Sequence, residues 1–100
     1  MTEQIMIKRI RARDPAGLEA LMERYTSYVS SIVWNILCYH MQPEDAEEVV
    51  SDVFLAAWNQ AEDLQSGKVK AWLAGVARNT ARKKLRDVGQ DLPLEEDIQC

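Results

Sequence analysis

The strongest constraint on the fold is a long run of apolar residues spaced as on one face of a helix. Between positions 18 and 37 they are Leu18, Leu21, Met22, Tyr25, Val29, Ile32, Val33, Ile36 and Leu37. Intervals of three and four residues are the periodicity of an amphipathic α-helix, and this one persists for about five turns. Asp14 and Pro15 precede it as an N-cap and a first-turn proline. The pattern predicts one long helix that buries this stripe.

Three further helices are expected around it. A second stripe follows Pro43, with Glu44 and Asp45 at the positive end of the helix, and consists of Ala46, Val49, Val50, Val53, Phe54 and Ala57. A third helix is expected from about residue 68 to residue 88, where Gly89 ends it, with Trp72, Leu73, Val76, Ala77 and Leu85 facing inward. The first dozen residues fit a short amphipathic helix, with Ile5, Met6, Ile7 and Ile10 as its apolar residues. We therefore predict an all-α fold, a compact bundle of three main helices plus a short N-terminal helix.

The charged residues are sorted into blocks of opposite sign. The net charge is only −4, but residues 41–63 hold seven acids and no bases, and residues 68–86 hold seven bases and no acids. Residues 89–100 are acidic again and are expected to be the start of a linker, so the folded domain is placed at residues 1–88. Such a division indicates partners of opposite charge.

Several classes of function are not supported by the sequence. No apolar run approaches the roughly 18 residues of a membrane span, and no signal peptide is visible. His40 is the only histidine, and phosphate-binding glycine motifs are absent. Cys38 and Cys100 form no metal or redox spacing, and Cys38 is expected to be a buried free thiol. We expect a cytoplasmic protein with no catalytic activity, no cofactor and no metal.

Three segments together resemble region 2 of the extracytoplasmic-function (ECF) sigma factors of the sigma-70 type. They are DPAGLEALMERY at residues 14–25, DAEEVVSDVFLAAW at residues 45–58 and KAWLAGVARNTAR at residues 70–82. Each motif alone is weak, but their order and separations match the family from residue 14 to residue 86. Two departures bear on function: Ser51 stands where the family has Gln, and Gly75 replaces a bulky or basic residue.

The resemblance implies that the second main helix binds the clamp helices of the largest RNA polymerase subunit. The residues that would form this face are Glu48, Ser51, Asp52 and Leu55. Their chemistry agrees, because an acidic row beside extra apolar side chains fits an interface with a charged rim and an apolar centre. The departure at Ser51 puts one of these contacts in doubt.

The resemblance also implies that the third main helix and the loop before it, residues 62–68, hold the non-template single strand of the promoter −10 element. The residues that would bind DNA are Gln65, Ser66, Lys68, Lys70, Arg78, Asn79, Arg82, Lys83 and Arg86. Phosphates require positive charge, and an asparagine can read the edge of a flipped base with a donor and an acceptor. We read Trp72 as a core residue.

Two other functions remain open from the sequence. One is a helical adaptor that binds only protein, with the acidic helix as its whole function. The other is a helix-turn-helix repressor that reads duplex DNA in the major groove. The resemblance further implies an anti-sigma factor as a regulatory partner, and a second helical domain beyond residue 100 that reads the −35 element.

Overall fold

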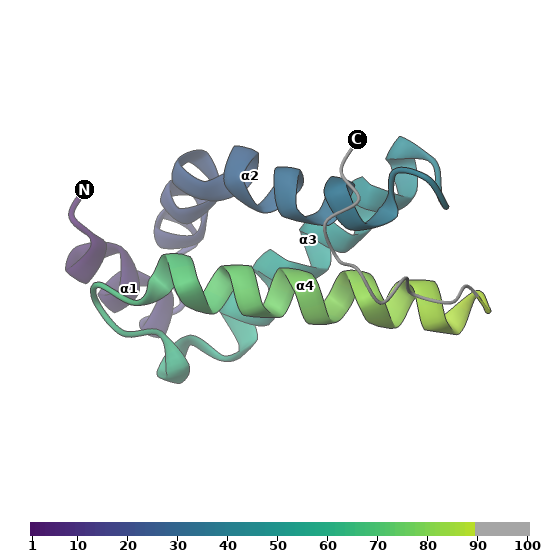
Figure 1. Ribbon diagram of the computed structural model, residues 1–100. Helices are drawn as coiled ribbons and strands as arrows, with labels where there is room; N and C mark the ends of the chain where they lie inside the picture. The colour runs from purple at the N-terminus through teal and green to yellow at the C-terminus, as the bar shows by residue number, and fades with distance from the viewer. Residues whose placement is uncertain (90–100) are drawn as a thin grey trace.

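The computed structural model describes residues 1–89, which form an all-α fold. Its elements are α1 (Glu3–Arg11), α2 (Pro15–Leu37), α3 (Pro43–Asn59), the short 3-10 helix η1 (Ala61–Asp63) and α4 (Val69–Asp87). α2, α3 and α4 pack on one another, and α1 lies at one end of the bundle against α2 (Figure 1). The predicted fold is thus confirmed over these residues. The linker predicted for residues 89–100 falls outside the described residues except for Gly89.

The helix ends follow the local signals in the sequence. The Asp14 carboxylate accepts a hydrogen bond from the backbone N–H of Ala16 at 3.0 Å and caps α2. Asp45 in the first turn of α3 accepts one from the backbone N–H of Gln42 at 3.1 Å. α4 starts and stops within one residue of its predicted limits, and Gly89 follows it with a left-handed φ of 78°.

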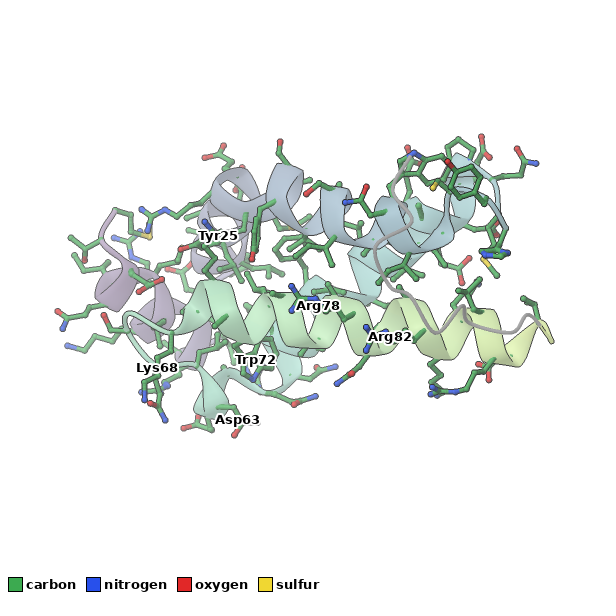
Figure 2. The ribbon with its side chains drawn as sticks, in the orientation of Figure 1. Tyr25, Asp63, Lys68, Trp72, Arg78 and Arg82 are labelled. Carbon is green, nitrogen blue, oxygen red and sulfur yellow. The ribbon has the colours of Figure 1, made fainter. Side chains whose placement is uncertain are left out.

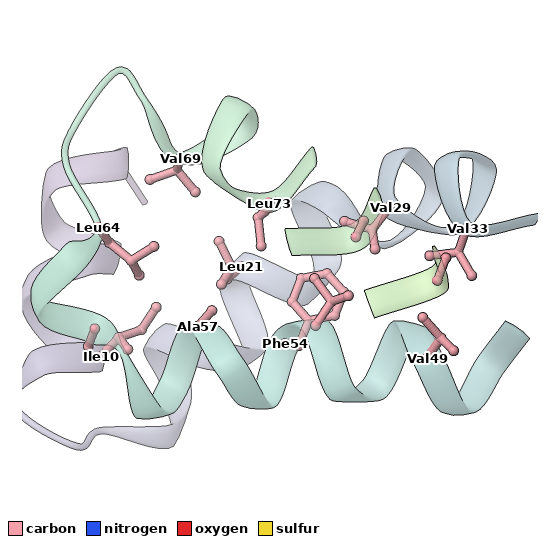
Figure 3. Packing of buried hydrophobic residues seen from close by; sticks show 14 of the residues in the cluster. Ile10, Leu21, Val29, Val33, Val49, Phe54, Ala57, Leu64, Val69 and Leu73 are labelled. Carbon is pink, nitrogen blue, oxygen red and sulfur yellow. The ribbon is translucent and has the colours of Figure 1, made fainter. Parts of the chain in front are cut away.

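The core is formed by apolar side chains from all four helices. Leu21 of α2, Phe54 of α3 and Leu73 of α4 are fully or almost fully buried and meet at its centre (Figure 3). Each such side chain contributes roughly 1.5–3 kcal/mol by its burial. Not every predicted stripe position is fully buried. Met22 is exposed. The half-buried positions are Leu18, Tyr25, Ile32, Ile36, Val50, Trp72 and Val76. The interval pattern alone does not set how deeply each position is buried.

Cys38, at the C-terminal end of α2, differs from its predicted state. It is half-buried, and it takes part in a disulfide. The expected buried free thiol is therefore wrong, and Cys38 gives no support to a reducing compartment. Separately, none of the helices within residues 1–89 combines the length and apolar character needed to cross a membrane.

The packing of α1 on α2 depends on a close approach at Gly17. A methyl group added to Gly17 would lie 2.8 Å from Cβ of Arg9 and 2.9 Å from the backbone nitrogen of Ile10. A Cβ atom and a backbone nitrogen cannot move away by rotation of a side chain, so α1 itself would have to move.

Gly17→Ala is therefore expected to lower the free energy of unfolding by about 2 kcal/mol, the cost of overpacking. Gly75→Ala is the matched control, because no described atom outside its own helix lies within 4 Å of the added methyl group. The control is expected to raise the free energy of unfolding by roughly 0.5–1 kcal/mol, since alanine is the better helix former. Urea denaturation measures both, and a Gly17→Ala variant as stable as the wild type would contradict this packing.

Candidate functional site

One side of α3 gathers the four residues predicted to bind polymerase. Ser51, Asp52 and Leu55 lie three, four and seven positions after Glu48, so the four residues share one face, and all four are exposed. Leu55 is 53% exposed, although the opposite side of the same helix is buried in the core. We call this set the acidic face. It offers an apolar side chain bordered by carboxylates to whatever binds there.

A shallow groove adjoins the acidic face between α2 and α3. It encloses about 440 Å³, and its lining includes Met22 and Trp34 of α2 with Val50 and Ser51 of α3. Sequence reasoning missed this groove because it placed Met22 in the buried stripe of α2.

The outward side of α4 forms a second surface, which we call the basic face. It consists of Arg78, Asn79, Arg82, Lys83 and Arg86. All are exposed except Arg82, which is half-buried, and the opposite side of the helix is buried in the core. Arg78 and Arg82 follow one another along the helix, and Trp72 lies nearer its start (Figure 2). The arginines are therefore not packed inside the fold.

Two lysines of α4 make contacts within the molecule. The ammonium of Lys70, a predicted DNA-binding residue, lies 4.6 Å from the centre of the Tyr28 ring on α2, a cation–π distance. The ammonium of Lys84 lies 3.4 Å from a carboxylate oxygen of Glu48. Exposed ion pairs of this kind contribute about 0–1 kcal/mol. Glu48 is 62% exposed at its side chain, so this contact leaves it accessible.

The segment between α3 and α4, residues 60–68, contains η1 and is called the α3–α4 loop below. Its predicted DNA-binding residues Gln65, Ser66 and Lys68 are all exposed. Leu64 is fully buried and attaches the loop to the core. The loop runs directly into the first turn of α4, whereas the basic face lies along the second half of the same helix.

Residues 21–90 match the family model for sigma-70 region 2. This chain belongs to the sigma-70 region 2 family. Over 97 residues the domain is 26% identical to the ECF RNA polymerase sigma-E factors of Escherichia coli K12, Escherichia coli O157:H7 and Shigella flexneri. The alignments cover 96% of this chain and 49% of each relative, so the chain spans about half the length of the curated relatives it matches. No solved structure gives a significant match. The resemblance to ECF region 2 is confirmed.

In this region 2 domain, sequence reasoning missed the residues that tie α1 to the α3–α4 loop. The Arg11 guanidinium donates hydrogen bonds to the backbone carbonyls of Ala61 at 3.2 Å, Glu62 at 3.4 Å and Leu64 at 2.7 Å. Arg13 donates to the carbonyl of Trp58, and its guanidinium lies 5.3 Å from the centre of that ring. These partners are 45 or more positions apart in the sequence, so no local pattern could connect them.

Glu3 of α1 makes the corresponding contact at the far end of the loop. Its carboxylate accepts hydrogen bonds from the backbone N–H of Gly67 and from the hydroxyl of Tyr25, the latter at 3.1 Å. Burial, together with the hydrogen bond and charge of Glu3, raises the pKa of Tyr25. The Tyr25 hydroxyl is therefore protonated at neutral pH and serves as the donor to Glu3.

Across residues 1–89, no group of three or more His, Cys, Asp or Glu side chains could hold a metal ion. None of the polar or charged residues described is fully buried. The charged groups of this region 2 domain therefore lie at the surface, where a large partner can reach them.

Proposed function

We propose that this region 2 domain is part of an ECF-type sigma factor that binds two partners at once. The acidic face binds the clamp helices of core RNA polymerase, and the basic face with the α3–α4 loop holds the non-template strand of the −10 element. The observation that carries this proposal is the exposure of two faces of opposite charge on neighbouring helices, α3 and α4.

The polymerase contact is supported by the chemistry of the acidic face. Leu55 supplies an apolar centre, and Glu48 and Asp52 supply a charged rim. Complementary charge on the polymerase side speeds and orients docking, while burial of Leu55 supplies affinity. Ser51 is exposed in the middle of this face and lines the adjoining groove. Serine is smaller than the glutamine that the family has at this position, so it does not block a partner that binds to this face.

The DNA contact is supported by the basic face. Arg78, Lys83 and Arg86 can each neutralise a phosphate and release a counterion. Asn79 is exposed among them and can read a base edge with its amide. The half-buried Trp72 lies nearer the start of α4 (Figure 2), where the loop joins the helix, and offers a partial stacking surface for an unstacked base.

On this proposal the domain acts by binding alone, in the bacterial cytoplasm, and catalyses no reaction of its own. The melting of the promoter is then driven by preferential binding of the unpaired strand, because a partner that binds only the open form shifts the equilibrium toward it.

The deciding experiment compares three binding partners for the same protein. Fluorescence anisotropy measures affinity for a single-stranded non-template −10 oligonucleotide and for the matching duplex, and a pull-down measures binding to purified core polymerase. We expect binding to polymerase and a clear preference for the single strand. Polymerase binding without any DNA binding would indicate the protein adaptor, and preference for the duplex would indicate the helix-turn-helix repressor.

A further inference from the structure

We infer that α1 fixes the position of the α3–α4 loop, with Arg11 and Glu3 as the positioning residues. The part of this inference that concerns DNA rests on the proposed function. The part that concerns the loop itself does not. α1 begins and ends before Leu21, where the region 2 match starts, so the family match does not include it.

Arg11 acts on the first half of the loop. Backbone carbonyls beyond the end of a helix need donors from elsewhere in the chain. Within residues 1–89 the carbonyls of Glu62 and Leu64 accept no backbone N–H, whereas that of Ala61 already accepts the N–H of Leu64 at 3.1 Å. The guanidinium of Arg11 supplies donors to Ala61, Glu62 and Leu64 from one rigid plane. Three bonds to one planar group fix the backbone direction across η1 far better than one bond could.

Glu3 acts on the second half of the loop. It accepts from the N–H of Gly67, and the Tyr25 hydroxyl holds the same carboxylate from the α2 side. Gly67 has a φ of 84°, a left-handed conformation that glycine adopts without strain. A turn lies at this glycine just before α4, so the Glu3 contact sets where the loop enters the first turn of α4.

α1 can act as a fixed support because it is itself held by the core. Met6 and Ile10 are fully buried, and Gly17 of α2 allows the close approach of Ile10 described above. Arg11 and Glu3 lie near opposite ends of this short helix, so they reach the two halves of the loop from one rigid element (Figure 1).

The consequence for function is preorganisation of the loop. Gln65, Ser66 and Lys68 are exposed, and they keep their relative positions only while the backbone beneath them is fixed. A loop that is already ordered loses less conformational entropy when it takes up an unpaired base, so it binds more tightly. Arg11 and Glu3 therefore raise DNA affinity without touching DNA.

The test uses the full chain with the substitutions Arg11→Gln and Arg11→Lys. Arg9→Gln is the matched control, because Arg9 is exposed on the same helix and its side chain makes no hydrogen bond or ion pair within residues 1–89. Amide hydrogen exchange by NMR follows Leu64 and Gly67 in the loop, with buried Val29 of α2 as the reference for global unfolding. Anisotropy with the single-stranded −10 oligonucleotide gives the DNA affinity of the folded protein.

We expect exchange at Leu64 and Gly67 to accelerate at least tenfold in Arg11→Gln while Val29 is little changed, and the Kd for the oligonucleotide to rise about tenfold. Arg11→Lys keeps the charge but loses the planar donor set, so it should show most of both effects. Arg9→Gln should show neither.

Two outcomes would overturn the inference, and they differ from failure of the proposed function. Unchanged exchange at Leu64 and Gly67 in both Arg11 variants means that α1 does not order the loop. Faster exchange with unchanged DNA affinity means that α1 orders the loop but that this order does not contribute to DNA binding. If the wild-type chain itself binds no oligonucleotide, the proposed function fails, and the exchange data alone still decide whether Arg11 positions the loop.

Discussion

Reversing both ends of the arginine row on the basic face, with Arg78→Glu and Arg86→Glu together, is expected to weaken binding of the single-stranded −10 oligonucleotide by about 100-fold. Neither side chain makes a hydrogen bond or ion pair within residues 1–89, and both are exposed, so the fold should be retained. Each reversal removes one attraction to a phosphate and adds one repulsion, so the two reversals together change four such interactions. At roughly 1 kcal/mol per interaction in water, reduced by salt, the double substitution weakens the binding free energy by about 3 kcal/mol.

The matched control reverses two bases on another helix, with Lys8→Glu and Arg9→Glu on α1. Both residues are exposed and lie in the last turn of α1, as Arg86 lies in the last turn of α4. Each double variant has a net charge of −8, because each substitution subtracts two from the wild-type charge of −4. Equal loss of DNA binding in the two variants would show that net charge, and not the basic face, determines affinity.

Salt dependence gives a second measurement on the same proteins. Each phosphate neutralised by a base contributes about 0.7 to the slope of log affinity against log salt for a single strand. The Arg78 and Arg86 variant should therefore have a slope that is flatter by about 1.4, and the α1 control should keep the wild-type slope. A loss of affinity with an unchanged slope would place the two arginines away from the phosphates.

The parts of the fold that the sequence predicted are those set by local interactions. Asp14 caps α2, and Pro43 opens α3 with Asp45 in its first turn, because each signal acts within a few residues of the backbone it affects. The residues of the acidic face and of the basic face could be grouped from the sequence for the same reason. Positions three, four and seven apart share a side of any helix, so Glu48 and Leu55 could be placed together without knowledge of the rest of the fold.

The parts that could not be predicted depend on contacts between distant segments. Arg11 looked like one base among several near the N-terminus, and nothing around it indicates three carbonyl partners at least 50 positions away. Lys70 and Lys84 counted as members of a basic run, although one lies over Tyr28 and the other beside Glu48. A charge block in a sequence therefore gives the sign of a surface, while the fold decides which of its charges remain available to a partner.

The polymerase contact leads to the second large effect. Leu55→Arg is expected to weaken binding of core polymerase at least 30-fold, because an exposed apolar side chain at the centre of an interface commonly contributes 2 kcal/mol or more. An arginine there would also place a positive charge where the proposed partner carries its own positive charges. The free energy of unfolding should change by no more than about 0.5 kcal/mol, because Leu55 is 53% exposed in the free domain.

Ile5→Arg is the control that separates an interface from general surface hydrophobicity. Ile5 is also an exposed apolar residue, at 44%, but it lies on α1 and not on the acidic face of α3. Biolayer interferometry with immobilised core polymerase should find Ile5→Arg close to the wild type and Leu55→Arg severely weakened. DNA affinity should be unchanged in both. Full polymerase binding by Leu55→Arg would remove the apolar centre on which the proposed interface depends, since no other large apolar side chain within the described part of α3 is as exposed.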